Sequence, residues 1–370
     1  MFRNSMKKLL LSATAFIAVI SLALTGCSDD NNSDSASSAD KPLIVVTTNI
    51  LGDVVTSMVG DSFNVEVIMP PGSDPHDFQA SAQQVQKMME ADLLIVNGAN
   101  FEEGMVDVIE NAESDGVMIF EAISVVSRLE GSDDHSDHGG HGDHDDHEGH
   151  DDHNEEGHGD HEGHDDHDEE KGHHDEEGHD DHEGHDDHEG HDHGGIDPHF
   201  FTDPARMAVV AEELSEFLVA NFPDVGGFTS TASDYVQQLR ELDADVEEIL
   251  SAVVSNERVL VTNHAVFAYF ADRYSFTVLG EIIPSSSTLA SASAQQLASL
   301  AEEIKENNVK AIFVDASSSD ALAQTLSSEV EGLEVINLYT ESLGDPGSSG
   351  ESYIDMVRFN AQAIASALVE

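Results

Sequence analysis

A histidine-rich acidic tract at residues 131–195 most constrains what this chain can fold into. The tract has 65 residues, of which 19 are His and 28 are Asp or Glu, and it contains no aliphatic or aromatic side chain. A segment with no apolar side chain to bury cannot offset the entropy that is lost on ordering, so we expect it to be disordered. The folded part must therefore come from the sequence on either side of the tract.

The tract repeats a loose unit, HDDHEGH, at residues 144–150, 179–185 and 185–191. Imidazole nitrogens and carboxylate oxygens at this density are ligands for borderline cations, above all Zn²⁺. A plain acidic linker uses Ser, Pro and Lys as filler and does not need His at about every third position. The composition therefore predicts that the tract binds metal.

The N-terminus has the pattern of an exported lipoprotein. Basic residues precede an apolar run at residues 9–24, which predicts a signal peptide over residues 1–26. The run is too short for a transmembrane anchor. The following Leu-Thr-Gly-Cys resembles a bacterial lipobox, which predicts lipid attachment to Cys27, the single Cys of the chain. Residues 27–41, rich in Ser, Asn and Asp, are then predicted to form a flexible tether.

The charge of the chain limits its partners. The formal net charge is −61, and the tract supplies −27 of it, with 28 acidic residues against one Lys. Such a chain repels nucleic acid and anionic lipid and attracts cations. We therefore expect no nucleic-acid partner.

Strand-like apolar runs alternate with helical patterns on both sides of the tract. They lie at residues 43–48, 63–69, 92–97, 117–120, 258–262, 276–281, 309–315 and 335–339. Continuous Val, Ile and Leu runs of this kind predict parallel sheets that are covered by helices. We expect an α/β fold with two such lobes, at residues 42–228 and 255–370.

The longest uninterrupted helical pattern covers residues 229–254 and contains no Gly or Pro. Its apolar face is formed by Tyr235, Leu239, Leu242, Val246, Ile249 and Val253. At about 1.5 Å per residue, this helix would span roughly 38 Å. It is therefore predicted to join the two lobes as a single rigid helix.

Only three of the 22 His residues lie outside the tract, and they are His76, His199 and His264. Each is predicted to lie just beyond the end of a strand, as are Asp315 and Glu341. Ligands of parallel sheets bind beyond the carboxyl ends of the strands. We therefore expect one cleft between the lobes to gather these residues as candidate metal ligands.

Several stretches resemble the zinc- and manganese-binding lipoproteins of ABC importers, the cluster A-I proteins with a rigid helix between two lobes. The matching stretches are PPGSDPHDF, DPHFFTDPARM, TNHAVFAYFADRYSF, KAIFVDASS and LYTESL followed by SYIDMVRFN. The resemblance implies metal ligands at His76, His199 and His264. The fourth, carboxylate ligand falls on Glu341, where many relatives have Asp, and Asp315 is the alternative.

Two aspartates are expected to support the site. Asp74 and Asp197 each precede a ligand His by two residues, and we expect them to orient that His or its backbone. Three imidazoles and one carboxylate suit tetrahedral Zn²⁺. Mn²⁺ would favour more carboxylates, whereas ligand type alone leaves Cu²⁺ open. Zinc-type members of the family that this chain resembles also carry a His-rich loop between their first two ligand histidines.

The resemblance implies an extracytoplasmic protein that is lipid-anchored to the outer face of the bacterial cytoplasmic membrane. It would capture Zn²⁺ and deliver it to an ABC permease and its ATPase, with a metallochaperone as a further candidate partner, and we expect a monomer. A zinc hydrolase is an alternative, but no HExxH motif or obvious general base accompanies the ligands. An extracellular metal buffer or adhesin is another. We expect a binding protein and not an enzyme.

Overall fold

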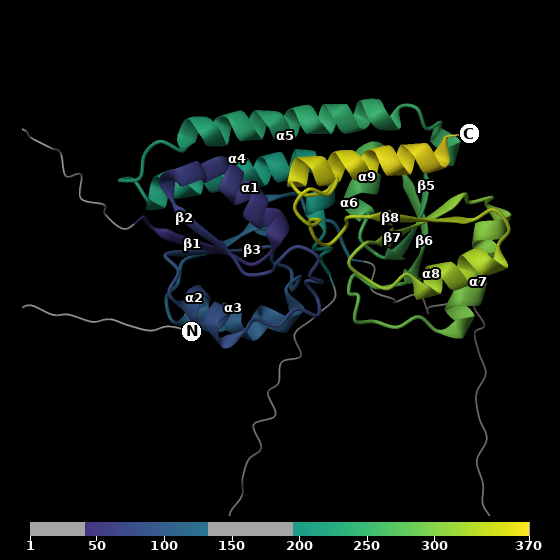
Figure 1. Cartoon of the computed structure of the whole chain (residues 1–370), viewed down its shortest axis with the longest axis horizontal. Helices are drawn as coiled ribbons and strands as arrows, with labels where there is room; N and C mark the ends of the chain where they lie inside the picture. Colours follow the sequence, from purple (N-terminus) through teal and green to yellow (C-terminus); the bar gives the residue numbers. More distant parts are fainter. Residues whose placement is uncertain (1–40, 132–194, 370) are drawn as a thin grey trace, which may run out of the picture. The chain divides into compact units, whose positions relative to one another are not determined.

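The computed structural model describes residues 41–131 and 195–369, which form the helices and strands drawn in colour in Figure 1. The predicted signal peptide, Cys27, the tether up to residue 40 and the tract between residues 132 and 194 lie outside the described residues. None of the helices in the described ranges is long and apolar enough to cross a membrane.

The first lobe is built on a four-stranded sheet in which every neighbouring pair of strands is parallel. The strand order is β2–β1–β3–β4, with β1 at Leu43–Val46, β2 at Asn64–Val67, β3 at Leu93–Val96 and β4 at Ile119–Glu121. Helices α1 (Asn49–Val59) and α4 (Pro204–Asn221) lie on one face, and α2 (Ala82–Met89) and α3 (Val106–Ser114) lie on the other (Figure 1). The predicted parallel sheet between helices is confirmed.

Alternation along β1 explains why both faces of this sheet are covered. Ile44 and Val46 pack into a core that includes α1 and α4. Val45 points to the opposite core, which includes Met88 of α2 and Ala112 of α3. Successive side chains of a strand point to opposite faces, so a continuous apolar run requires helices on both sides.

The second lobe repeats this architecture with strand order β6–β5–β7–β8, again all parallel. Its strands are β5 (Val259–His264), β6 (Thr277–Ile283), β7 (Ala311–Asp315) and β8 (Glu334–Leu338). Buried side chains of α7 (Ala294–Glu306) and α8 (Ala321–Glu329) share one core with Val261 of β5. Those of α6 (Ala268–Tyr274) and α9 (Tyr353–Leu368) share the other core with Leu260.

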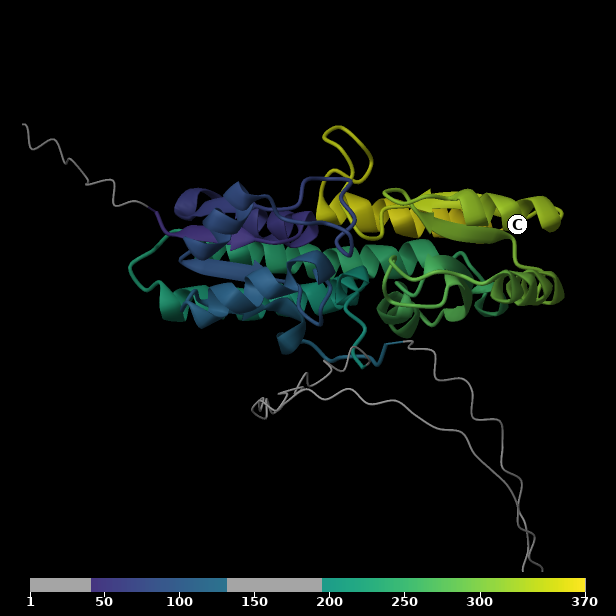
Figure 2. The same ribbon diagram turned by 90° about the horizontal axis from the view of Figure 1, so that it is seen from below.

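Helix α5 (Thr229–Leu250) lies along both lobes, against α1 and α4 of the first and α9 of the second (Figures 1 and 2). It ends at Leu250, four residues before the predicted end. The Arg258 guanidinium donates hydrogen bonds to the backbone oxygens of Leu250 at 3.0 Å and Val253 at 3.1 Å. These bonds satisfy carbonyl groups that a longer helix would have used internally.

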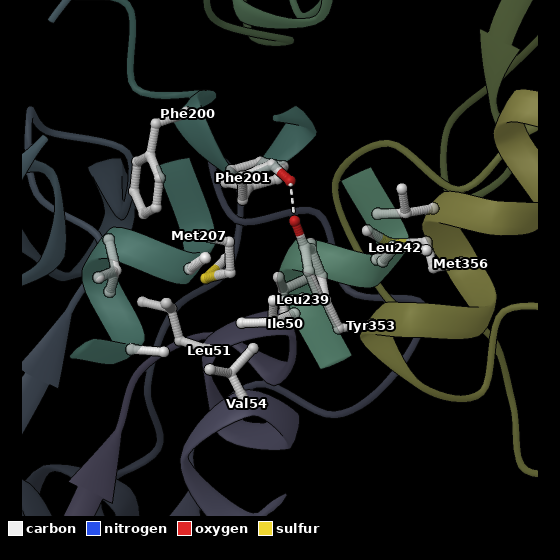
Figure 3. Close-up of a cluster of buried hydrophobic side chains, with 14 of the residues drawn as sticks. Ile50, Leu51, Val54, Phe200, Phe201, Met207, Leu239, Leu242, Tyr353 and Met356 are labelled. Carbon is white, nitrogen blue, oxygen red and sulfur yellow. Dashed lines mark hydrogen bonds between the residues drawn. The ribbon is translucent and has the colours of Figure 1, made fainter. Parts of the chain in front are cut away.

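The two lobes share one apolar core (Figure 3). It draws on α1, α4, α5 and α9, with Ile50, Leu51, Val54, Met207, Leu239, Leu242 and Met356 among its buried members. The hydroxyl of Tyr353 on α9 donates a hydrogen bond to the backbone oxygen of Phe201 at 2.8 Å. Separating the lobes here would expose apolar surface, which is costly, so this side of the molecule is held together firmly.

Candidate metal centre

His76 lies in a loop after β2 that is stiffened by Pro70, Pro71 and Pro75. Asp74 accepts a hydrogen bond from the backbone N–H of His76 at 2.9 Å and another from the Thr288 hydroxyl of the second lobe at 2.8 Å. The His76 ring is buried, with 2% exposed, and its Nδ1 lies 2.9 Å from Oε1 of Glu103. Asp74 therefore orients the backbone, as expected, whereas Glu103 orients the ring.

His199 follows Asp197 and Pro198 and precedes a 3₁₀ turn at Phe200–Thr202. The prediction that it lies just beyond a strand end is therefore wrong, because the described residues that lead into it, 195–198, form no strand. Asp197 Oδ1 accepts the backbone N–H of His199 at 2.8 Å and lies 2.7 Å from its Nδ1. One carboxylate thus fixes both the backbone and the ring, in the manner typical of metal-ligating His.

His264 is the last residue of β5, and Glu341 lies in the loop that follows β8. Asp315, at the end of β7, accepts backbone N–H bonds from Thr340 at 3.0 Å and Glu341 at 3.1 Å. It also accepts a bond from the Thr340 hydroxyl. The fold therefore uses Asp315 to hold the loop that carries Glu341.

The four residues His76, His199, His264 and Glu341 converge, and one donor atom from each lies within 4.8 Å of the others. Oε1 of Glu341 lies 2.7 Å from Nε2 of His264 and 3.2 Å from Nε2 of His199, and its Oε2 lies 3.3 Å from Nε2 of His76. All four side chains are buried. Donors of a tetrahedral site with bonds of about 2.1 Å lie roughly 3.4 Å apart, a separation that falls within the 4.8 Å spanned by these four donors.

The electrostatics of the centre pair one carboxylate with three imidazoles. Burial alone would raise the pKa of Glu341, but His264, His76 and His199 hold that pKa well below its usual range. Burial lowers the pKa of His76, yet Glu341 and Glu103 outweigh it and raise that pKa to about 10. Asp197 and Glu341 similarly outweigh burial and raise the pKa of His199 to about 9. A cation that enters must therefore displace protons.

A cavity of about 510 Å³ reaches the centre from the His76 side. Its lining includes the carboxylates of Glu103, Asp107 and Glu110 and the Ser285–Ser287 segment. Carboxylates that line a cleft raise the local concentration of cations. The cavity thus provides an acidic approach to His76.

The two ends of the tract meet beside the centre. The backbone N–H of Gly131 donates to the backbone oxygen of Gly195 at 3.3 Å, and that of Asp197 donates to Leu129 at 2.9 Å. Asp197 in turn holds His199. Gly195, to which Gly131 is bonded, therefore lies four residues before His199.

Glu103, the partner of the His76 ring, was not predicted from the sequence. It adjoins Glu102, which is equally acidic but turns inward, where it accepts hydrogen bonds from the hydroxyl of Thr47 at 2.5 Å and the N–H of Asn97 at 2.7 Å. Both residues follow β3, with Glu103 at the start of a short 3₁₀ helix, and this position beyond a strand was a signal for the site. Nothing in their identities distinguishes the one that faces His76.

Comparison with known families identifies the class of protein. The family model "Zinc-uptake complex component A periplasmic" matches residues 44–367. The chain belongs to this family. Its members are extracytoplasmic binding components of ABC importers, which confirms the prediction of an extracytoplasmic binding protein that is not an enzyme.

The names of individual relatives refer to different metals. The manganese ABC transporter substrate-binding lipoprotein PsaA of Streptococcus anginosus is 25% identical over 98% of this chain and 99% of its own length. The zinc-binding lipoprotein AdcA of Streptococcus pneumoniae is 28% identical over 97% of this chain, which spans 60% of AdcA. The structure of the periplasmic zinc-binding protein TroA from Treponema pallidum aligns with a TM-score of 0.67 at 24% identity, covering 89% of this chain and all of TroA. That likeness confirms the predicted two-lobe fold.

Proposed function

We propose that this protein captures Zn²⁺ outside the cytoplasm and delivers it to an ABC permease that is driven by its ATPase. The observation that carries the proposal is the convergence of His76, His199, His264 and Glu341 at one buried point between the lobes. Two of the three imidazoles have a carboxylate at Nδ1, which leaves Nε2 directed at the centre. This is how proteins prepare His for metal binding.

The donor set favours zinc over manganese. Three imidazole nitrogens and one carboxylate suit tetrahedral Zn²⁺, whereas Mn²⁺ prefers sites richer in oxygen. Relatives that are named for zinc and for manganese align with this chain at similar identity, 28% and 25%. The preference for zinc therefore rests on the donors of this chain, and Cu²⁺ is the competitor to include in any test.

The remaining parts of the proposal come from the sequence. The tract would collect zinc ions weakly and raise their concentration near the centre, since its junctions lie beside Asp197. Lipid on Cys27 would keep the monomer at the outer face of the membrane, near the permease. A metallochaperone that loads the site is a further candidate partner.

A metal titration of the full chain tests the proposal. Zn²⁺, Mn²⁺ and Cu²⁺ are titrated in parallel by competition with a chromophoric chelator, and the metal content of the purified protein is measured. We expect one tight zinc site that is lost in His199→Ala and retained in His161→Ala, a matched change inside the tract. Tighter binding of Mn²⁺ than of Zn²⁺, or equal losses in both variants, would contradict the proposal.

A further inference from the structure

A buried asparagine connects the two lobes beside the metal centre. Asn49, the first residue of α1, donates through Nδ2 to the backbone oxygen of Pro70 at 3.0 Å and to Oγ of Ser342 at 2.8 Å. Its Oδ1 accepts the backbone N–H of Leu343 at 2.8 Å. One side chain of the first lobe thus contacts the loop that carries His76 and the loop that carries Glu341.

Ser342 completes the connection from the second lobe. Its Oγ also accepts the backbone N–H of Gly72 at 2.8 Å, and the same N–H lies 3.2 Å from the backbone oxygen of Leu343. Gly72 has φ +76°, a left-handed conformation that other residues rarely adopt. This conformation belongs to the turn that presents the Gly72 N–H to the second lobe.

These bonds act on the centre through the backbone. Ser342 directly follows Glu341, and Pro70 and Gly72 belong to the stiff loop that ends at His76. Asn49 and Ser342 therefore fix the distance between two ligand loops that come from different lobes. The Asp74–Thr288 bond also crosses between the lobes, but it does not contact the Glu341 loop.

We propose that Asn49 and Ser342 are positioning residues that form a clasp, whose opening sets the rate at which the bound ion leaves. Opening the clasp exchanges a few hydrogen bonds for bonds to water, which costs little free energy for each bond. Separating the lobes at Tyr353 would instead expose the shared apolar core. The lobes therefore part most easily at the clasp, and the core side stays closed.

The proposal rests on the proposed function for its ion, and the test uses Asn49→Ala, Ser342→Ala and Ser327→Ala in the full chain. Ser327 is the matched control, because its hydroxyl donates to the backbone oxygen of Leu333 at 2.6 Å within the second lobe. Zinc release is followed by stopped flow against excess chelator. We expect release to be about tenfold faster in Asn49→Ala and a few-fold faster in Ser342→Ala, from the hydrogen bonds lost.

Two further measurements distinguish opening of the clasp from a change in the ligand set and from a general loss of stability. The absorption spectrum of bound Co²⁺ should be unchanged in the variants, because no ligand is altered. In metal-free protein, the amide protons of Gly72 and Leu343 should exchange faster in both clasp variants and not in the control. Release rates equal to wild type, or an equal acceleration in Ser327→Ala, would overturn the clasp.

The result that would contradict the proposed function differs from the result that would contradict the clasp. Wild-type protein that holds neither Zn²⁺ nor Mn²⁺ contradicts the function and, with it, the role of the clasp in release. The amide exchange of Gly72 and Leu343 then decides separately whether Asn49 and Ser342 tie the lobes together. Unchanged exchange in Asn49→Ala would overturn that tie as well.

Discussion

The carboxylate of Asp315 accepts a hydrogen bond from the backbone N–H of Glu341 at 3.1 Å. Asp315 ends β7 and Glu341 follows β8, and the sequence offered both as the fourth ligand. Glu341 extends from its loop toward the three imidazoles, whereas Asp315 turns back to fix that loop. Two acidic residues with similar sequence contexts thus serve different purposes, and mutation should separate them.

Glu341→Gln should abolish tight zinc binding and preserve cooperative unfolding, because an amide cannot supply an anionic ligand. Asp315→Asn should weaken zinc binding by about 10–100-fold, as is typical of a lost supporting carboxylate. It should also destabilise the metal-free protein by roughly 1.5–3 kcal/mol, because charged hydrogen bonds are lost. Calorimetric zinc titration and urea unfolding measure the two effects. The reverse ranking of the affinities would show that Asp315 is the ligand.

Asp197→Asn should weaken zinc binding by about 10–100-fold with little change in overall stability. The carboxylate of Asp197 lies 2.7 Å from Nδ1 of His199, and an amide there no longer supports the tautomer in which Nε2 faces the ion. Asp92→Asn is the matched control. Asp92 lies away from the centre, and its carboxylate accepts a hydrogen bond of 2.8 Å from the backbone N–H of Leu43. Equal zinc affinity in the two variants would contradict this role of Asp197.

Metal-free protein should lose stability as the pH rises from about 6.5 to about 10. The pKa of His76 is raised to about 10 and that of His199 to about 9, whereas an unfolded His titrates near 6.5. The folded state therefore binds more protons in this window, so its stability is complete below pH 6.5 and falls as the pH increases. Urea unfolding across this range measures the effect, and His76→Gln with His199→Gln should remove most of it.

Zinc affinity should change with pH in the opposite sense. The ion must displace the protons of His76 and His199, so apparent affinity should rise by up to about tenfold per pH unit for each proton displaced. A titration in buffers of different ionisation enthalpy counts the protons released. A constant affinity between pH 6 and 8 would mean that the metal-free centre holds no such protons.

Much of the fold could be predicted from local sequence patterns. Asp203 followed by Pro204 is a local pattern typical of a helix start, and Asp203 accepts the N–H groups of Ala205 and Arg206 at 2.8 and 3.3 Å. Capping acts over three residues, so a local pattern reveals it. The end of α5 at Leu250 depends instead on the Arg258 guanidinium, and such a contact forms only after the chain has turned.

The same distinction applies to the centre. The three His outside the tract were candidates because they were so few, and Asp197 because it is two residues from His199. Asn49 gave no signal, since its partner Ser342 is 293 positions away. Contacts of this kind depend on how the two lobes pack, which propensity and periodicity do not encode.

Cys27→Ala should leave the protein unprocessed or released from the membrane. Cys27 is the single Cys of the chain, so no other thiol can accept a lipid. Membrane fractionation with mass analysis of the mature N-terminus checks the outcome, and Ser28→Ala is the control. Unchanged membrane retention of a correctly cleaved Cys27→Ala variant would exclude lipid on this residue as the anchor.

Deletion of residues 132–194 should leave one tight zinc site and remove a set of weaker sites. Gly131 and Gly195 already share a backbone hydrogen bond at 3.3 Å, so the chain can be rejoined there with little change around Asp197. A long, polar tract must order its backbone for each ion that it binds, and it should therefore bind more weakly than a preformed centre.

The tract's 19 His would, when all are protonated, change its charge from −27 to −8, and imidazolium cannot coordinate metal. The extra ions should accordingly be released between pH 7 and 5, and zinc-limited uptake should slow in the deletion variant. Loss of the tight site on deletion would show that the tract supplies part of the primary ligand set.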